Sequence, residues 1–184
     1  MGIQEIEIAK YVKRLVEKDF TCFDIGSAYG YYTLALARLT RMGKVIAFEP
    51  QDELFELLEL TIKRNSNLPI TFELHNTRIG AESSGMTTSL DDFVVRDEDR
   101  VPDFIKIDVD GAESEILQGS RVVIQRFRPR FVIEVHSYEL EEDCVQLLNE
   151  YGYVCRIVNQ QMIWPELRPI ELNRWVIATH KRDE

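Results

Sequence analysis

The sequence predicts an α/β fold with a doubly wound, mostly parallel sheet. Short apolar stretches suited to buried strands alternate with stretches of helical periodicity through the first five predicted strands. A glycine-containing bend, FDIGSAYG at residues 23–30, joins the first strand to a helix. Because parallel strands need crossover connections, helices should cover both faces of this sheet.

Seven strands are predicted. They span residues 21–25, 44–48, 70–74, 104–109, 131–135, 153–158 and 175–179. Residues 159–173 contain no clear helix, so the last two strands should pair antiparallel as a hairpin. Residues 76–88 fit either short strands or a flexible loop.

Helical periodicity occurs in five stretches, which are residues 3–18, 31–41, 52–64, 114–127 and 140–151. The first stretch, residues 3–18, is amphipathic and should pack on the sheet edge or on a partner. A homodimer is therefore one of the alternatives. Gly43 should stop the second helix, Asn65 should form a left-handed cap after the third, and Gly119 is a weak point in the fourth.

Length and composition predict one domain over residues 1–184, with residues 1–18 as an N-terminal helix packed on it. The net charge of -10 argues against a sequence-independent nucleic-acid surface, which needs clustered Lys and Arg. No apolar run approaches the roughly 20 residues of a membrane span. Three cysteines without metal-type spacing favour reduced thiols and a cytoplasmic location.

The bend at residues 23–30 has the features of a strand-to-helix nucleotide loop. Gly26 and Gly30 let the backbone turn sharply, but their G-x-x-x-G spacing differs from the G-x-G-x-x-G of dinucleotide-binding loops. Asp24 would repel a pyrophosphate and suits a ligand that brings an ammonium group or hydroxyls. S-adenosylmethionine is such a ligand, and an ordinary surface turn is the alternative.

Four predicted strands carry a polar residue at the same relative place, namely Asp24, Glu49, Asp108 and His136. In a doubly wound sheet these residues should gather at the carboxyl edge, where ligands bind. Glu49 follows Asp24 by 25 residues, close to the spacing at which an acid reaches ribose hydroxyls. His136 fits either a general base or a packing residue with hydrogen bonds.

The stretch KIDVDGAE concentrates Asp108, Asp110 and Glu113 around a glycine. These carboxylates suit orientation of an acceptor, binding of a divalent cation, or capping of the next helix. Lys106 and Glu134 should face one another inside the sheet, because two charges among apolar residues need each other.

The segments FDIGSAYGYYTLAL, VIAFEP, TTSLDDF, IKIDVDGAE and FVIEVH, in this order, resemble the FkbM-type family of S-adenosylmethionine-dependent methyltransferases. The resemblance covers Thr21 to His136, and IKIDVDGAE is its most diagnostic part. It implies a class I methyltransferase (Rossmann-like) fold and O-methylation of sugar or natural-product hydroxyls. The family commonly has Asn where Ala28 stands and Glu where Asp110 stands.

The leading prediction is an enzyme that transfers a methyl group from S-adenosyl-L-methionine to a hydroxyl of a sugar, glycan or natural product. The expected catalytic residues are Asp108, His136 and Glu113, and the expected cofactor-binding residues are Asp24, Gly26, Ser27, Gly30, Tyr31, Glu49, Pro50, Asn76 and Asp108. No metal is expected, although a divalent cation bound by Asp108, Asp110 and Glu113 is kept as an alternative. The alternatives are a cofactor-binding module without catalysis and, less favoured, an NAD-dependent oxidoreductase.

Overall fold

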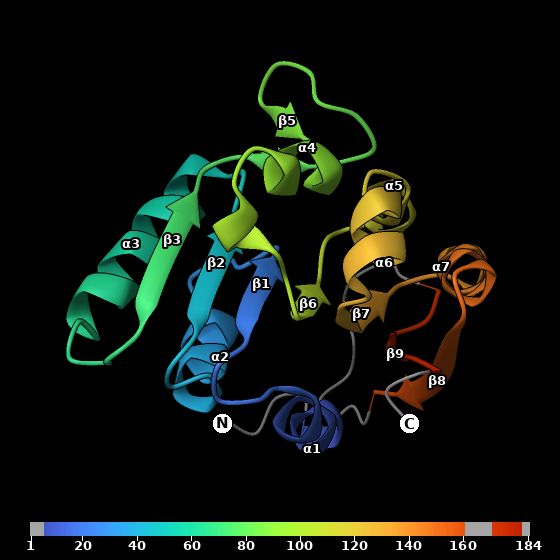
Figure 1. Cartoon of the computed structure of the whole chain (residues 1–184), viewed down its shortest axis with the longest axis horizontal. Coiled ribbons are helices and arrows are strands. Elements are labelled where there is room, and N and C mark those ends of the chain that lie inside the picture. The colour runs from blue at the N-terminus through green and yellow to red at the C-terminus, as the bar shows by residue number, and fades with distance from the viewer. Residues whose placement is uncertain (1–5, 161–170, 182–184) are drawn as a thin grey trace.

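A computed structural model describes residues 6–160 and 171–181, and a seven-stranded sheet forms its centre (Figure 1). The strands are β1 (Thr21–Ile25), β2 (Lys44–Phe48), β3 (Thr71–His75), β6 (Phe104–Ile107), β7 (Arg130–Val135), β8 (Tyr153–Asn159) and β9 (Arg174–His180). Their order across the sheet is β3-β2-β1-β6-β7-β9-β8. The first five pair in parallel, while β9 is antiparallel to both β7 and β8. The predicted α/β class and the antiparallel pairing of the last two strands are confirmed.

The helices are α1 (Ile6–Leu15), α2 (Tyr31–Leu39), α3 (Asp52–Arg64), α4 (Leu90–Val95), α5 (Glu113–Gln118), α6 (Arg121–Phe127) and α7 (Tyr138–Glu150). A 3₁₀ turn, η1, covers Glu98–Arg100. Residues 76–88 contain two short strands, β4 (Arg78–Ile79) and β5 (Thr87–Thr88), which pair with each other. Gly119 separates α5 from α6, as its position in the sequence predicted.

The predicted left-handed cap at Asn65 is wrong. Asn65 has φ −114°, and its side-chain Nδ2 donates a hydrogen bond to the carbonyl of Thr61 at 2.9 Å. The amide side chain therefore satisfies a carbonyl in the last turn of α3 directly, so no left-handed residue is needed there.

The two faces of the sheet follow the alternation of side chains along each strand. On one face Phe23, Ile105 and Ile133 pack with α4, α5, α6 and α7. On the other face Phe104 and Val132 pack with α1 and α2. The same alternation sends three ionisable residues, Asp24, Lys106 and Glu134, toward the α1 and α2 face, where each is at most 3% exposed.

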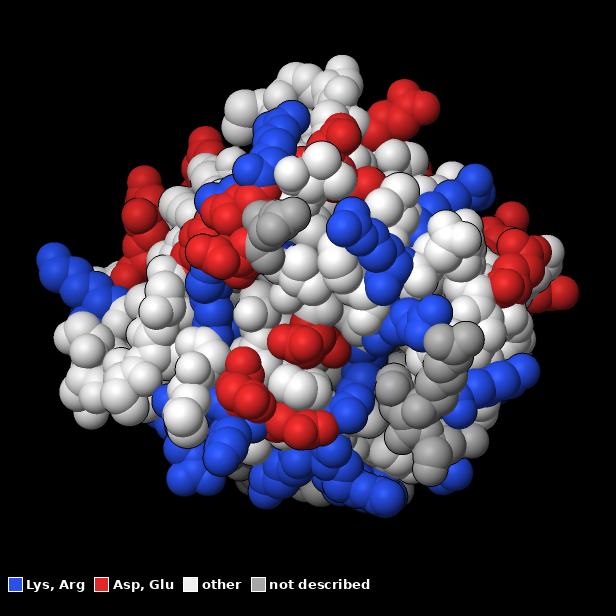
Figure 2. Space-filling view, in the orientation of Figure 1, with Lys and Arg blue, Asp and Glu red and all other residues white. Residues whose placement is uncertain are grey.

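The surface charge is unevenly distributed. Lys10, Lys13 and Arg14 of α1 are exposed, and Figure 2 shows basic side chains along the lower edge of the view, where α1 lies in Figure 1. Arg130, the first residue of β7, donates a hydrogen bond to the carbonyl of Leu15 at 2.7 Å. This basic surface therefore lies at the amino edge of the parallel strands, away from the carboxyl edge where ligands bind in such sheets.

Within the described part of the chain, no helix has the length and apolar character needed to cross a membrane. All three cysteine thiols are free.

Candidate functional site

Gly26 brings the ends of three strands together. Its φ is +77°, and a Cβ atom at this position would overlap the carbonyl oxygen of Asp108 at the end of β6. The N–H groups of Gly26 and Ser27 both donate to the carbonyl of Phe48 at the end of β2, at 3.0 and 3.1 Å. Only glycine therefore permits this convergence of β1, β2 and β6.

The bend continues through two further left-handed residues. Ala28 has φ +45° and Gly30, which precedes α2, has φ +92°. The left-handed conformation is costly for a residue that carries a Cβ atom. The Ala28 N–H donates to Glu49 Oε2 at 2.9 Å, and this bond holds the residue in place.

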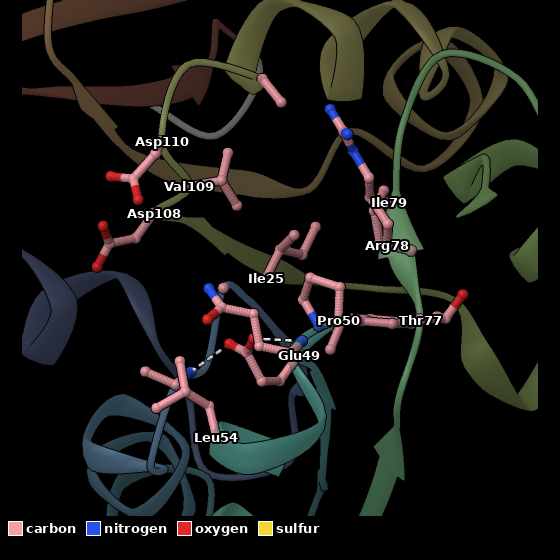
Figure 3. Close-up of a pocket in the computed structure, with 15 residues that line it drawn as sticks. Ile25, Glu49, Pro50, Leu54, Thr77, Arg78, Ile79, Asp108, Val109 and Asp110 are labelled. Atoms are coloured by element: carbon pink, nitrogen blue, oxygen red, sulfur yellow. Dashed lines mark hydrogen bonds between the residues drawn. The ribbon is translucent and has the colours of Figure 1, made fainter. Parts of the chain in front are cut away.

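Glu49 is fixed by the backbone on both sides. It is 3% exposed, and its second carboxylate oxygen, Oε1, accepts the N–H of Gln51 at 2.9 Å (Figure 3). Bonds from N–H groups to an ionised carboxylate are among the stronger protein hydrogen bonds. Each carboxylate oxygen keeps a lone pair for another donor, so Glu49 is oriented and still able to bind hydroxyl groups.

A cavity of about 380 Å³ opens at this carboxyl edge of the sheet. Its lining comes from the last residues of β1 and β2 and from the chain that follows β1, β2, β3 and β6, namely Ile25, Gly26, Ala28, Phe48, Glu49, Pro50, Gln51, Leu54, Thr77, Arg78, Ile79, Asp108, Val109, Asp110 and Ala112. In Figure 3 Pro50, Thr77 and Ile79 lie on one side of it and Asp108 and Asp110 on the other, with Glu49 between them. The cavity therefore has a mainly apolar side, formed by Pro50, Thr77 and Ile79, and three carboxylates, those of Glu49, Asp108 and Asp110.

Asp108 is the strand-end carboxylate that reaches this cavity. Its side chain is 28% exposed, and Oδ2 accepts a hydrogen bond from Lys106 Nζ at 2.8 Å. Burial alone would raise the pKa of Asp108, but the charge of Lys106 and hydrogen bonds from Glu134 and Lys106 outweigh it and lower the pKa to about 2. Asp108 is therefore ionised at neutral pH.

Asp24 lies outside the cavity lining. It is fully buried on the α1 and α2 face, where Thr33 donates to it at 2.6 Å and Lys106 Nζ lies 3.7 Å from Oδ1. Burial raises the pKa of Asp24 against the opposing charge of Lys106. Asp24 was predicted to bind the cofactor; in the structure it lies within β1, opposite Lys106 of β6, and Lys106 is its cationic neighbour.

His136 does not line the cavity either, and its surroundings correct the expectation that it titrates near neutral pH. Its Nδ1 lies 3.6 Å from Glu113 Oε1 and its Nε2 lies 3.6 Å from Glu134 Oε1. The contacts with Glu113 and then Glu134 raise the pKa of His136 to about 10. The imidazole therefore carries both protons at neutral pH and has no free lone pair to act as a base.

Glu134 is buried between His136 and Asp108. Burial and a hydrogen bond to Asp108 raise the pKa of Glu134 to about 8. Lys106 and Glu134 are both buried on the same face of neighbouring strands, as predicted, but the register differs, because Lys106 lies opposite Val132. Asp108 influences the pKa of Glu134 and accepts a hydrogen bond from Lys106.

The other residues predicted to bind the cofactor do not line the cavity, and Tyr31 lines a separate hollow beside Lys13 of α1. The Ser27 hydroxyl donates to the Phe48 carbonyl, and the Tyr31 ring packs edge-on against Tyr32. Asn76 donates to Asp52 at 2.7 Å, and its buried Oδ1 has no hydrogen-bond partner among the described residues. Asn76 immediately precedes Thr77 of the lining, so this free acceptor lies next to the apolar wall.

Among the described residues, no three His, Cys, Asp or Glu side chains gather as a metal site would require. Glu113 is turned toward His136 and the N–H of Gly111. Asp110, in contrast, lines the cavity beside Asp108.

The sequence reading missed the wall formed by Leu54, Thr77, Arg78 and Ile79. These residues lie in a helix and in the 76–88 segment, whose composition carried no recognisable signal. Only their position after a predicted strand end placed them near the carboxyl edge of the sheet.

The lining fits S-adenosylmethionine. Phe48, Pro50 and Ile79 offer an apolar surface for an aromatic base, and the fixed carboxylate of Glu49 suits ribose hydroxyls. Asp108 and Asp110 provide negative charge for the ammonium and sulfonium groups of the cofactor.

Comparison with known proteins agrees with this geometry. Residues 73–155 match a family model described as the Methyltransferase FkbM domain. The chain is 25% identical over 167 residues to the hexuronic acid methyltransferase AglP of Haloferax volcanii, an alignment that covers 79% of this chain and 68% of AglP.

Solved methyltransferase structures share the fold. The crystal structure of methyltransferase FkbM from Methylobacillus flagellatus matches with a TM-score of 0.67 and 20% identity, over 88% of this chain and 44% of that chain. The present chain thus spans less than half of that relative. Precorrin-6y C5,15-methyltransferase from Geobacter metallireducens matches with a TM-score of 0.67 and 16% identity, over 95% and 88% of the two chains. These matches, with the strand order, confirm a class I methyltransferase fold. Residues 73–155 are therefore similar to the FkbM methyltransferase domain, a family whose cofactor is S-adenosyl-L-methionine, and the chain has the class I methyltransferase fold.

Proposed function

We propose that this protein transfers a methyl group from S-adenosyl-L-methionine to a hydroxyl of a sugar, glycan or natural product. The observation that carries the proposal is the cavity at the carboxyl edge, where the fixed Glu49 carboxylate and the Asp108 carboxylate line one continuous space. Methyl transfer needs alignment of the acceptor oxygen and removal of its proton, and a cavity with these two ends can provide both.

The cofactor half of the cavity has residues for each part of the ligand. Glu49 would accept the ribose hydroxyls, Pro50 and Ile79 would hold the adenine, and Asn76 Oδ1 would accept its amino group. Gly26 would leave room for the amino-acid part, because it adds no side chain at the cavity. When bound, the cofactor supplies an electrophilic methyl group. The chain positions the ligand and the acceptor.

The end of the cavity where the amino-acid part of the cofactor would meet the acceptor is acidic, because Asp108 and Asp110 lie there. Arg78, the one basic side chain of the lining, lies on the opposite side beside Ile79, with its Nη2 3.6 Å from Glu115 Oε2 (Figure 3). Asp108 suits orientation of a hydroxyl group as a hydrogen-bond acceptor. The similarity to a hexuronic acid methyltransferase favours a sugar acceptor, and Arg78 is the residue that would pair with a sugar carboxylate.

Cofactor binding tests the first half of the proposal. We expect S-adenosylmethionine and its demethylated product to bind in calorimetric titrations, and Glu49→Gln to weaken both about tenfold or more, because a hydrogen bond to a charged group contributes about 1.5–3 kcal/mol. Glu53→Gln, an exposed acid on α3, is the matched control and should bind like the parent protein. Equal affinity of the Glu49→Gln variant and the parent would place the cofactor elsewhere.

Methyl transfer tests the second half. Cofactor labelled on its methyl group should label a hydroxylated acceptor from a panel that pairs each neutral hexose glycoside with its hexuronic acid. Arg78→Gln should lower transfer to the hexuronic acid and leave the neutral sugar unaffected if the carboxylate is read there. Tight cofactor binding without transfer to any hydroxyl would favour a binding module over an enzyme.

A further inference from the structure

A buried row of ionisable side chains leads away from the cavity. It runs from Asp24 through Lys106, Asp108, Glu134 and His136 to Glu113. All of these residues except Asp108 are at most 8% exposed, and only Asp108 and the exposed Asp110 of this region line the cavity. Asp108 thus connects the row to bound ligands.

The row contains more acid than base. Four carboxyl groups, those of Asp24, Asp108, Glu113 and Glu134, face two basic groups, Lys106 and His136. Tyr32 places its ring 4.4 Å from Lys106 Nζ, which adds no formal charge. An ionised carboxylate without a partner is expensive to bury, so at least one carboxyl group in the row should retain a proton.

The contact between Asp108 and Glu134 locates this proton. Ile107 of β6 is paired with Ile133 of β7, so the following residues, Asp108 and Glu134, come side by side. Burial and the adjacent Asp108 carboxylate raise the pKa of Glu134, because two neighbouring carboxylates repel one another and the pair tends to keep one proton. Lys106 Nζ, 2.8 Å from Asp108, keeps the negative charge on Asp108 and leaves the proton on Glu134.

We propose that Asp108 and Glu134 form a carboxyl pair that shares one proton at rest and, once fully ionised, receives the proton of the methyl acceptor. His136 is the buried cation that stabilises the ionised pair from behind, and it does not take the proton itself. The catalytic half of this inference rests on the proposed O-methyl transfer, whereas the shared proton is a property of the protein alone.

The acceptor O–H bond breaks and an oxygen–methyl bond forms, while the sulfur–methyl bond breaks and its electron pair returns to sulfur, which becomes a neutral thioether. The proton passes to Asp108 and is held between Asp108 and Glu134 until it leaves to solvent. Asp108 touches the acceptor, and Glu134 and His136 act through it as positioning residues.

The titration of the groups fits this order of events. The pKa of Glu134 is raised to about 8 and that of His136 to about 10, so the pair loses its shared proton while His136 is still charged. The active form should therefore accumulate as the pH rises through about 8. The other ionisable groups around the pair are Lys106 and Asp24 on the neighbouring strands and Glu113 at the start of α5.

Infrared spectroscopy on the ligand-free protein tests the shared proton. With ¹³C-labelled glutamate, a protonated glutamic acid band should persist at pH 7 and disappear with a midpoint near 8. The band should be absent from Glu134→Gln and present in Glu142→Gln, a matched variant at an exposed site on α7. Two results would contradict the proposed pair. The band could disappear at the pH at which an ordinary glutamate ionises, or it could remain in Glu134→Gln.

The role of His136 has its own test, which also holds if Glu134→Gln fails to fold. In His136→Gln the glutamate band should disappear at a higher pH than in the parent protein, because a cation that lowers the pKa of Glu134 has been removed. If the midpoint pH of the band is unchanged or lower in His136→Gln, His136 is not the cation that stabilises the ionised pair.

Turnover of an identified acceptor separates this inference from the proposed function. The rate should rise about tenfold per pH unit below 8 in the parent protein. His136→Gln should recover its activity at higher pH, whereas Glu134→Gln should lose about 10²-fold or more at every pH, with partial rescue by Glu134→Asp. If His136→Gln stays inactive at high pH, His136 is the base after all. If no acceptor reacts but the band behaves as expected, only the proposed function fails.

Discussion

At the scale of single residues, Ala28 is held in a conformation that suits few side chains. Its φ of +45° is left-handed, and asparagine tolerates this region better than alanine. We expect Ala28→Asn to raise the free energy of unfolding by about 0.5–1 kcal/mol and Ala28→Val to lower it by more than 1 kcal/mol. Denaturant unfolding of the two variants measures both changes. Stabilisation by valine would show that backbone strain is absent at this position.

Single residues also mark the limits of prediction from sequence. Gly26 and Glu49 were correctly placed at the cavity because a strand end, a bend and an acid at a known spacing constrain the backbone itself. Asp24 and His136 were expected at the same edge, but neither lines the cavity, because each is buried against charged side chains of neighbouring elements. Their charged neighbours, Lys106 and Glu113, come from distant parts of the chain, so the raised pKa of His136 had no signal in the sequence.

At the scale of elements, α7 begins with a defined cap. Ser137 Oγ accepts the N–H of Leu140 at 3.2 Å, which satisfies one of the free donors in the first turn. We expect Ser137→Ala to lower the free energy of unfolding by about 1 kcal/mol and Ser137→Asp to retain it. Thermal unfolding compares the two. An alanine variant as stable as the parent would mean that solvent replaces the cap without cost.

Strands were easier to predict than the segments between them. Thr21–Ile25, Lys44–Phe48 and Asp52–Arg64 were predicted with their observed bounds, since burial and helical spacing are local properties of these residues. The short strands β4 and β5 were left open, because two-residue strands have no periodicity to detect. The position of β9 between β7 and β8 was not predicted either, because the order of strands in a sheet depends on pairing between distant residues and has no local signal in the chain.

At the scale of the whole molecule, the buried row makes stability depend on pH. His136 has an ordinary pKa of 6.5 and a folded pKa of about 10, and Glu134 has 4.5 and about 8. Both folded values are raised. Each group therefore contributes stability that is complete below its ordinary pKa and is lost as the pH rises through its folded pKa. The free energy of unfolding should thus fall between pH 6.5 and 9.

The slope should approach about 1.4 kcal/mol per pH unit for each proton that only the folded chain retains. Denaturant unfolding at a series of pH values measures it. His136→Gln should flatten the slope, while Ser137→Ala, which leaves both titrating groups in place, should lower the whole curve and keep its slope. A parent protein that grows more stable from pH 6.5 to 9 would contradict the raised pKa values.

The position of β9 also determines how late during synthesis on the ribosome the sheet can be completed. β8 joins the sheet only through β9, and β7 has β9 as its second neighbour. Until residues 174–180 have left the exit tunnel, β7 presents an open edge and β8 has no neighbouring strand to pair with. An unpaired strand edge is a template for association between chains. Each nascent chain is therefore exposed to pairing with its neighbours up to the moment its last described strand emerges, and the insertion of that strand closes the sheet in one event.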